Sequence, residues 1–393
     1  NIQFKKLNNL RIFFPEIILF LIFILLSFQF FNYEKNLTNY VFEENLINYY
    51  GGLIRRGFLG SIALFFFQSF EINPKLFFTI IYYSLYIFLV LIFFYLINNL
   101  KKENFYLSTL IVVSPATLLF VIFDNDALFR KEIFFILIFF IHVFIANKIF
   151  ERKLVYVEYL KLNFYFIVPI LFFNILIHEF QFFLLFFHYL INLLVLNFLK
   201  KRNKIFNYLY IFLTVVFITI ILAGNENKVF DIENSLETFI PEIKNDYGPT
   251  DMLNGNVNLV IGSFLKMIIS SKFSEFFQVF LMLVFSVLFF LYIFIRLLEK
   301  NNFKLDYFKY LNCIFIIYTF VILFIFIVTA FDYGRLFHII TMHIIGFYLI
   351  LPNKTYKFSS KSMSESILIK IGIFSYFLFF SMPHAHILMG KGS

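Results

Sequence analysis

Runs of about 20 apolar residues recur along the whole chain, and no other feature restricts the fold as strongly. Such a run can cross the hydrocarbon core of a bilayer as one helix. With 61% hydrophobic and 15% charged residues, the chain also lacks the polar surface that a soluble protein of 393 residues needs. The sequence therefore predicts an all-α, polytopic transmembrane helix bundle of about 11 spans. They are expected at about residues 12–32, 76–98, 105–123, 133–149, 162–177, 180–199, 205–223, 274–298, 310–330, 336–351 and 366–384.

Two shorter apolar stretches, 57–67 and 257–269, are predicted to be interfacial or re-entrant helices, because they are too short to cross comfortably. They lie in the largest non-spanning segments, the outer loops 33–75 and 224–273. No stretch has the composition of a soluble domain, so residues 1–393 are predicted to form a single integral membrane domain. The lone Cys313 excludes an intrachain disulfide.

Lysine and arginine residues beside the spans predict the orientation, since such residues favour the cytoplasmic side. If the N-terminus is cytoplasmic, every connecting segment on that side is net positive, whereas the acids collect on the outer side. We therefore expect a cytoplasmic N-terminus. The net charge of +9 then reflects topology beside an anionic inner leaflet, and it gives no support to nucleic-acid binding.

With this topology, the unusual polar stretches all fall on the outer side. A secondary transporter usually carries polar or ionisable groups near the middle of the membrane, and the sequence offers almost none there. An enzyme at the outer surface needs carboxylates and arginines at helix ends on one side, which favours the enzyme class. The stretches are YYGGLIRRGFLG (49–60), FDNDALFRKE (123–132), HEFQ (178–181), the acidic segment 224–256, FDYGR (331–335) and PHAH (383–386).

The densest of these stretches contains Asp124, Asp126, Arg130 and Lys131. If the fourth span begins near Asp126, helical spacing puts Asp126 and Arg130 one turn apart, with Lys131 about 100° round the helix. One interpretation is an acidic N-cap with an i,i+4 ion pair. The other is a carboxylate base beside a cationic clamp for phosphate.

Arg55 and Arg56 stand between pairs of glycines in GGLIRRGFLG. Glycine lets the backbone approach a ligand closely, and the guanidinium fork matches phosphate oxygens. The loop is therefore a candidate site for a lipid-linked pyrophosphate. The alternative is an interfacial helix whose arginines contact lipid headgroups.

His178 and Glu179 mark a tight outer turn, where they make the turn polar or where Glu179 has a raised pKa and acts as acid or base. Asp332 and Arg335 form either an ion pair at a helix start or part of the same site. Glu43 and Glu44 in the first outer loop are lower-ranked catalytic acids. No metal site is predicted, because a third ligand with defined spacing is missing. The histidines given least weight are His384 and His386, and below them His142, His188, His338 and His343.

The set GGLIRRGFLG, SPATLLF, DNDALFRKE, HE and DYGR resembles a recurring pattern in uncharacterised multi-spanning bacterial membrane proteins, with Tyr333 and Leu336 where a Trp flanks the last element. More distantly, the layout resembles GT-C glycosyltransferases and O-antigen (Wzy-like) polymerases. That resemblance implies polyprenyl-phosphate-linked or pyrophosphate-linked sugar donors, catalysis at the outer face by acids and arginines, and Glu43 and Glu44 in the place of first-loop acids. Shared architecture alone does not fix function.

These observations predict a membrane glycosyltransferase or polysaccharide polymerase of the bacterial inner membrane. Asp126 ranks first as the base, followed by Glu179 and Asp332. The expected partners are a lipid-linked sugar and membrane lipids, with no cofactor, a divalent metal optional and the oligomeric state open. A lipid-linked sugar flippase or transporter and a non-catalytic membrane assembly subunit are the alternatives. The residues expected to bind phosphate or sugar are Arg55, Arg56, Asp124, Arg130, Lys131, His178 and Arg335.

Overall fold

All regular structure in the described part of the chain is helical, which confirms the predicted all-α class for these residues. The computed structural model describes residues 13–33, 37–103, 105–223, 231–232, 234–236, 291, 306–329 and 333–350. The span predicted at 274–298, apart from Leu291, the span predicted at 366–384 and the short helix predicted at 257–269 lie outside these residues.

The helices follow the apolar runs closely over most of the described chain. Those long and apolar enough to cross a membrane are Phe14–Phe31, Pro74–Lys101, Glu132–Phe150, Tyr156–Ile177, Gln181–Phe198 and Ile205–Leu222. The elements, in chain order, are α2 (Phe14–Phe31), α4 (Asn39–Leu46), α5 (Gly57–Phe70), α6 (Pro74–Glu103), α7 (Phe105–Val113), α8 (Phe120–Phe123), the 3-10 helix η1 (Asn125–Phe129), α9 (Glu132–Phe150), α10 (Tyr156–Leu162), the π-helix η2 (Asn163–Ile167), α11 (Val168–Ile177), α12 (Gln181–Phe198), α13 (Ile205–Ala223), α18 (Asp306–Thr329) and α19 (Tyr333–Leu349).

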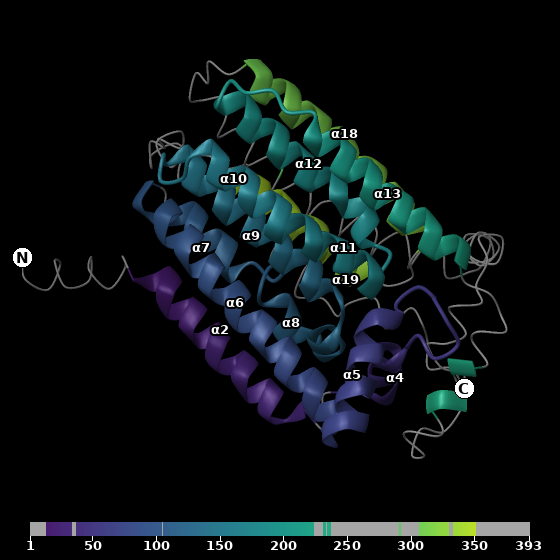
Figure 1. Ribbon diagram of the computed structural model, residues 1–393. Coiled ribbons are helices and arrows are strands. Elements are labelled where there is room, and N and C mark those ends of the chain that lie inside the picture. The colour runs from purple at the N-terminus through teal and green to yellow at the C-terminus, as the bar shows by residue number, and fades with distance from the viewer. Residues whose placement is uncertain are drawn as a thin grey trace, which may run out of the picture.

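Helix α9 forms the centre of the bundle. It packs against α6, α12 and α19, and most of its residues are buried. A helix that is apolar on every side is suited to such a position, whereas edge helices turn apolar side chains outward. Figure 1 shows the long helices side by side, with α2 along one edge and α13 with α18 along the other. The many exposed apolar side chains of α2 and α13 fit contact with lipid.

The stretch predicted as one continuous span at 105–123 is divided in the structure. Helix α7 ends at Val113, and a turn over 114–119 separates it from α8. Pro115 has no N–H to continue the helix, and the Thr117 hydroxyl donates to the carbonyls of Ile111 (2.9 Å) and Ser114 (2.8 Å). The His338 imidazole of α19 donates through Nδ1 to the Ala116 carbonyl at 2.9 Å. Buried side chains thus satisfy backbone groups that lipid could not.

Several other helices have bounds different from those predicted, among them α6, which ends at Glu103 instead of 98, and α18, which begins at Asp306 instead of 310. The span predicted at 162–177 begins earlier, because α10, η2 and α11 run on without a break from Tyr156 to Ile177. The interfacial helix predicted at 57–67 is α5, which continues to Phe70 and packs against α4, α6 and α11.

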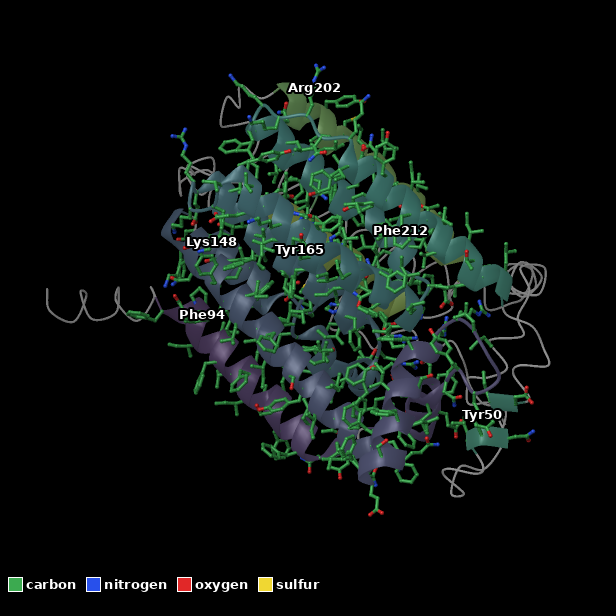
Figure 2. All side chains as sticks on the ribbon, viewed as in Figure 1. Tyr50, Phe94, Lys148, Tyr165, Arg202 and Phe212 are labelled. Carbon is green, nitrogen blue, oxygen red and sulfur yellow. The ribbon has the colours of Figure 1, made fainter. Side chains whose placement is uncertain are left out.

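The two ends of the bundle differ in the residues that they carry. Figure 2 shows Lys148 and Arg202 toward one end and Tyr50 at the other. This separation matches the basic and polar sides that the sequence predicts. Which end faces the cytoplasm stays a prediction.

Candidate functional site

Charged side chains from distant parts of the chain meet at the end of the bundle that contains α4 and α5. They come from α4, from the turn before α5, from the junction of η1 with α9, and from the turn between α11 and α12. Ion pairs and hydrogen bonds join these segments directly. We call this set the charged cluster: Glu44, Arg55, Arg56, Arg130, Lys131, His178 and Glu179.

Arg56 is the hub of the charged cluster. Its Nε lies 3.0 Å and its Nη2 2.7 Å from the two carboxylate oxygens of Glu179, which gives a two-pronged ion pair. Its Nη1 also donates to Glu44 at 3.3 Å. One guanidinium therefore joins α4 to the turn between α11 and α12. Arg55 approaches the same Glu179 carboxylate at 3.7 Å.

Glu44 receives two further contacts from the start of α9. Its carboxylate accepts a hydrogen bond from Arg130 Nη1, and the Arg130 guanidinium lies 5.2 Å from the centre of the Tyr40 ring. The ammonium of Lys131 donates to the Glu44 backbone carbonyl at 2.9 Å and reaches the Arg56 carbonyl at 3.5 Å. Lys131 thereby holds the backbone at Glu44 and the backbone at Arg56.

The arginines keep both carboxylates of the charged cluster ionised. Burial alone would raise the pKa of Glu44, but Arg130 and Arg56 hold it below its usual range. Burial likewise opposes ionisation of Glu179, and the charge of Arg56 holds its pKa well below the usual range. Of the two interpretations of Glu179, the one that gave it a raised pKa is therefore wrong for this arrangement, because the sequence did not show that two arginines flank it.

Burial has the opposite effect on the bases. It lowers the pKa of Lys131 to about 8, although Glu44 acts against the shift. It also lowers the pKa of His178 to about 3, with Arg56 adding to the effect. The backbone N–H of Phe180 donates to His178 Nδ1 at 3.2 Å, which requires a lone pair on that nitrogen. His178 is therefore neutral and serves as an acceptor in this turn.

The glycines of the GGLIRRGFLG stretch bring α4 and α5 close together. A Cβ on Gly60 would lie 2.1 Å from the Ile47 carbonyl oxygen, and one on Gly57 would lie 2.4 Å from the Tyr49 ring. Arg56 has φ 67°, a left-handed conformation that is uncommon outside glycine. These glycines thus have a packing role, beside the close approach to a ligand that the sequence suggested.

Asn45 fixes α4 against the rest of the bundle. Its side-chain amide donates to the carbonyls of Val41 and Phe129, both at 2.9 Å, and accepts from the Tyr82 hydroxyl at 2.6 Å. These contacts link α4 to η1 and α6. Glu44 directly precedes Asn45 in α4 and is thereby held facing Arg130.

The other predicted site residues lie beside the charged cluster or outside the residues that the structure describes. Arg335 donates to Glu132 at 3.2 Å, which ties α19 to the first residue of α9. Asp124 is buried at the start of the same junction. Residues Asn125–Phe129 form a 3-10 helix and α9 begins only at Glu132, so the α-helical start expected near Asp126 is wrong. Asp332 and the side chain of Asp126 lie outside the described residues, so ion pairs with Arg335 and Arg130 stay predictions.

Glu44, which the sequence placed among the lower-ranked acids, lies between Arg56 and Arg130, and Glu132 was missed as a partner of Arg335. The only signal for Glu44 was its place among the acids of the first outer loop. Among the described residues no group of three or more histidine, cysteine or acidic side chains is arranged to hold a metal ion. His384 and His386 lie outside the described residues.

This arrangement can bind an anion and move a proton. An anionic group that enters the charged cluster competes with Glu44 and Glu179 for the arginines. A carboxylate that loses its arginine has a higher pKa and becomes a stronger base. The charged cluster therefore holds its acids ionised in the resting protein and can free one when an anion binds.

Comparisons with protein family models, with curated proteins and with solved structures give no match to this chain. The class of protein must therefore be argued from the fold and the charged cluster alone. The fold is an all-helical bundle whose apolar helices suit a multi-pass membrane protein. Its charged cluster lies at one end of that bundle.

Proposed function

We propose that this protein is a membrane glycosyltransferase or polysaccharide polymerase that acts on polyprenyl-phosphate-linked or pyrophosphate-linked sugars. The observation that carries the proposal is the meeting of Glu44, Arg56 and Glu179 with the start of α9. Glycosyl transfer needs a base for the acceptor hydroxyl and positive charge for the departing lipid phosphate. A cluster of carboxylates and arginines at a bundle end supplies both.

In this proposal, the lipid phosphate takes over arginine contacts that the carboxylates hold in the resting protein. Arg55, with a side chain 25% exposed, is the first contact, and Arg56 and Arg130 follow. The released Glu179 or Glu44 then takes the proton of the acceptor hydroxyl. Asp126 and Asp332 remain candidates for the same base, on the sequence pattern alone.

The proposal includes a topology and a location. We propose about 11 spans, a cytoplasmic N-terminus and a charged cluster on the outer face of a bacterial inner membrane. The expected substrate then reaches the site along the outer leaflet, and the apolar flanks of the bundle accommodate its polyprenyl chain.

A Glu179→Gln variant tests the base. Extension of lipid-linked glycan by membranes that contain the full chain should fall by about 100-fold or more. Glu151→Gln is the matched control, because Glu151 is also ion-paired, to Lys153 at 2.7 Å, and should keep the normal rate. A normal rate in Glu179→Gln would remove Glu179 as the base.

A second variant keeps the test valid if Glu179→Gln folds poorly. Arg55 lies at the partly exposed edge of the charged cluster, so Arg55→Gln should fold. We expect it to raise KM for the lipid-linked donor more than it lowers kcat. An unchanged KM would argue against phosphate binding at this edge.

A lipid-linked sugar transporter is the second candidate, and the interior of the bundle favours it. Helix α7 ends within the bundle, and buried polar side chains of α9, α10 and α12 form hydrogen bonds to one another. The sequence had suggested almost no polar groups at this depth. Proteoliposomes separate the candidates, since a transporter moves the donor across the bilayer without extending it.

A further inference from the structure

A chain of hydrogen-bonded side chains runs through the interior of the bundle. His142 Nδ1 of α9 lies 3.0 Å from His188 Nδ1 of α12, and His142 Nε2 lies 3.1 Å from the Tyr159 hydroxyl of α10. Tyr159 donates to Asn192 Oδ1 at 2.6 Å, and the Asn192 amide donates to the Tyr210 hydroxyl of α13 at 3.0 Å. We call these residues the interior chain: His142, His188, Tyr159, Asn192 and Tyr210.

His142, the first member of the interior chain, lies near the middle of α9. At 1.5 Å per residue, His142 is about 15 Å along α9 from Glu132 and about 12 Å from Phe150. His142, His188 and Tyr159 are fully buried. Ionisable side chains at this depth of a membrane protein are costly and usually functional.

The hydrogen bonds fix the position of each proton. Because Tyr159 donates to Asn192, its oxygen accepts from His142 Nε2–H. His142 Nδ1 is then an acceptor, and it receives the Nδ1–H of His188. This leaves a lone pair on His188 Nε2, a buried atom with no hydrogen-bond partner among the described residues.

We propose that His188 Nε2 is a proton-binding site within the bundle. A proton added there forms an N–H bond and breaks none of the existing hydrogen bonds. The pair then carries one positive charge, which His188 shares with His142 through the Nδ1–H bond, and the oxygen of Tyr159 faces the far nitrogen. The ligand is a single proton taken from water, and no other bond is made or broken.

The polar side chains described around His142 and His188 are amides, imidazoles and phenols, so a proton bound to the pair supplies most of the charge there. The described polar side chains that face the two imidazoles are Tyr159, Asn192 and His343 of α19, besides each other. His343 donates through Nδ1 to its own helix at Ile339 O, 2.8 Å away. Tyr318 of α18 donates to the Phe183 carbonyl, and Tyr189 lies beside Tyr210 at the far end.

This inference does not depend on the proposed transferase activity, because the interior chain shares no residue with the charged cluster. Polar side chains between membrane helices also act as simple packing contacts, and that role requires no uptake of a proton. The state of His188 distinguishes the two roles.

Nuclear magnetic resonance of the full chain in nanodiscs, with imidazole-15N histidine, tests the proposal. At pH 8 we expect His142 to carry its proton on Nε2 and His188 on Nδ1. On acidification the His188 signals should change to those of an imidazolium. His188→Gln and His142→Gln assign the signals. In His343→Gln, which removes a neighbour that bonds its own helix, His188 should still become an imidazolium on acidification.

Tyr159→Phe separates proton binding from packing. The variant removes the oxygen that faces the charged pair, so the imidazolium should form only at lower pH than in the parent protein. A structural role predicts no such movement. The proposal is overturned if His188 keeps its neutral signals at the lowest pH at which circular dichroism still shows the folded protein.

Discussion

At the scale of single residues, Arg56 shows how one side chain can join segments that lie far apart in sequence. It binds Glu44, twelve residues away, and Glu179, 123 residues away. Each carboxylate compensates the guanidinium, and none of the three is exposed. Removal of one acid should therefore leave a buried charge without full compensation.

Glu44→Gln should lower the free energy of unfolding by about 3–5 kcal/mol, since Arg130 loses a carboxylate in a buried site. Glu43→Gln is the matched control on the same helix turn, and its half-buried position predicts a change below about 1 kcal/mol. Denaturant unfolding of the purified protein in detergent measures both. Equal effects would show that Glu44 is not central to the charged cluster.

The lowered pKa of Lys131 predicts that the folded protein becomes more stable at alkaline pH. Its pKa is about 8 in the folded protein and 10.5 ordinarily, so between these values the unfolded chain binds a proton that the folded chain has released. The free energy of unfolding should therefore rise with pH over this window, by about 3 kcal/mol in total from 1.36 kcal/mol per pKa unit. Unfolding at pH 7, 9 and 10.5 measures it.

Lys131→Met provides the comparison for this pH dependence. The variant has no ammonium at position 131, so the difference between it and the parent protein isolates the contribution of Lys131. That difference should shift in favour of the parent protein between pH 8 and 10.5. A constant difference would mean that Lys131 is not the titrating group.

Sequence reasoning found most residues of the charged cluster but could not rank them. Arg55, Arg56, Arg130 and Glu179 stood out because charge is rare in apolar surroundings. Glu44 did not stand out, because its importance comes from contacts 86 and 12 residues away. His142 and His188 were set aside for the same reason, since each is a single polar residue in its own helix.

At the scale of elements, the approach of α4 to α5 positions Glu44. Helix α4 was not predicted, because NYVFEENL has no long apolar run and it is short. Its partner α5 was visible in the sequence, although its end was placed at 67 instead of Phe70. The division of the stretch 105–123 was missed because its residues are apolar on both sides of Pro115.

Gly60→Ala should separate α4 from α5. The added Cβ would meet backbone atoms of Ile47 and Leu46, which cannot move as a flexible side chain would. We expect a loss of about 1–3 kcal/mol in the free energy of unfolding. Ser69→Ala, at an exposed position of the same helix, is the control and should change little. An equal change in both variants would contradict the close contact at Gly60.

At the scale of the whole molecule, the positions of the basic loops predict which end of the bundle faces the cytoplasm. Labelling of single cysteines with a membrane-impermeant maleimide checks it, after Cys313 is replaced by serine because it is exposed. Tyr50→Cys should react in intact cells, and Arg202→Cys only after the membrane is opened. Reaction of both from the same side would contradict the predicted orientation.

The divided stretch after α7 also has a consequence for the assembly of the protein during synthesis. The Ala116 carbonyl lies in the turn where α7 has ended, and its partner is His338, which is 222 residues later in the chain. Lipid offers no hydrogen bond in the meantime. The hydrogen bond that completes the turn after α7 can therefore form only after α19 has been made.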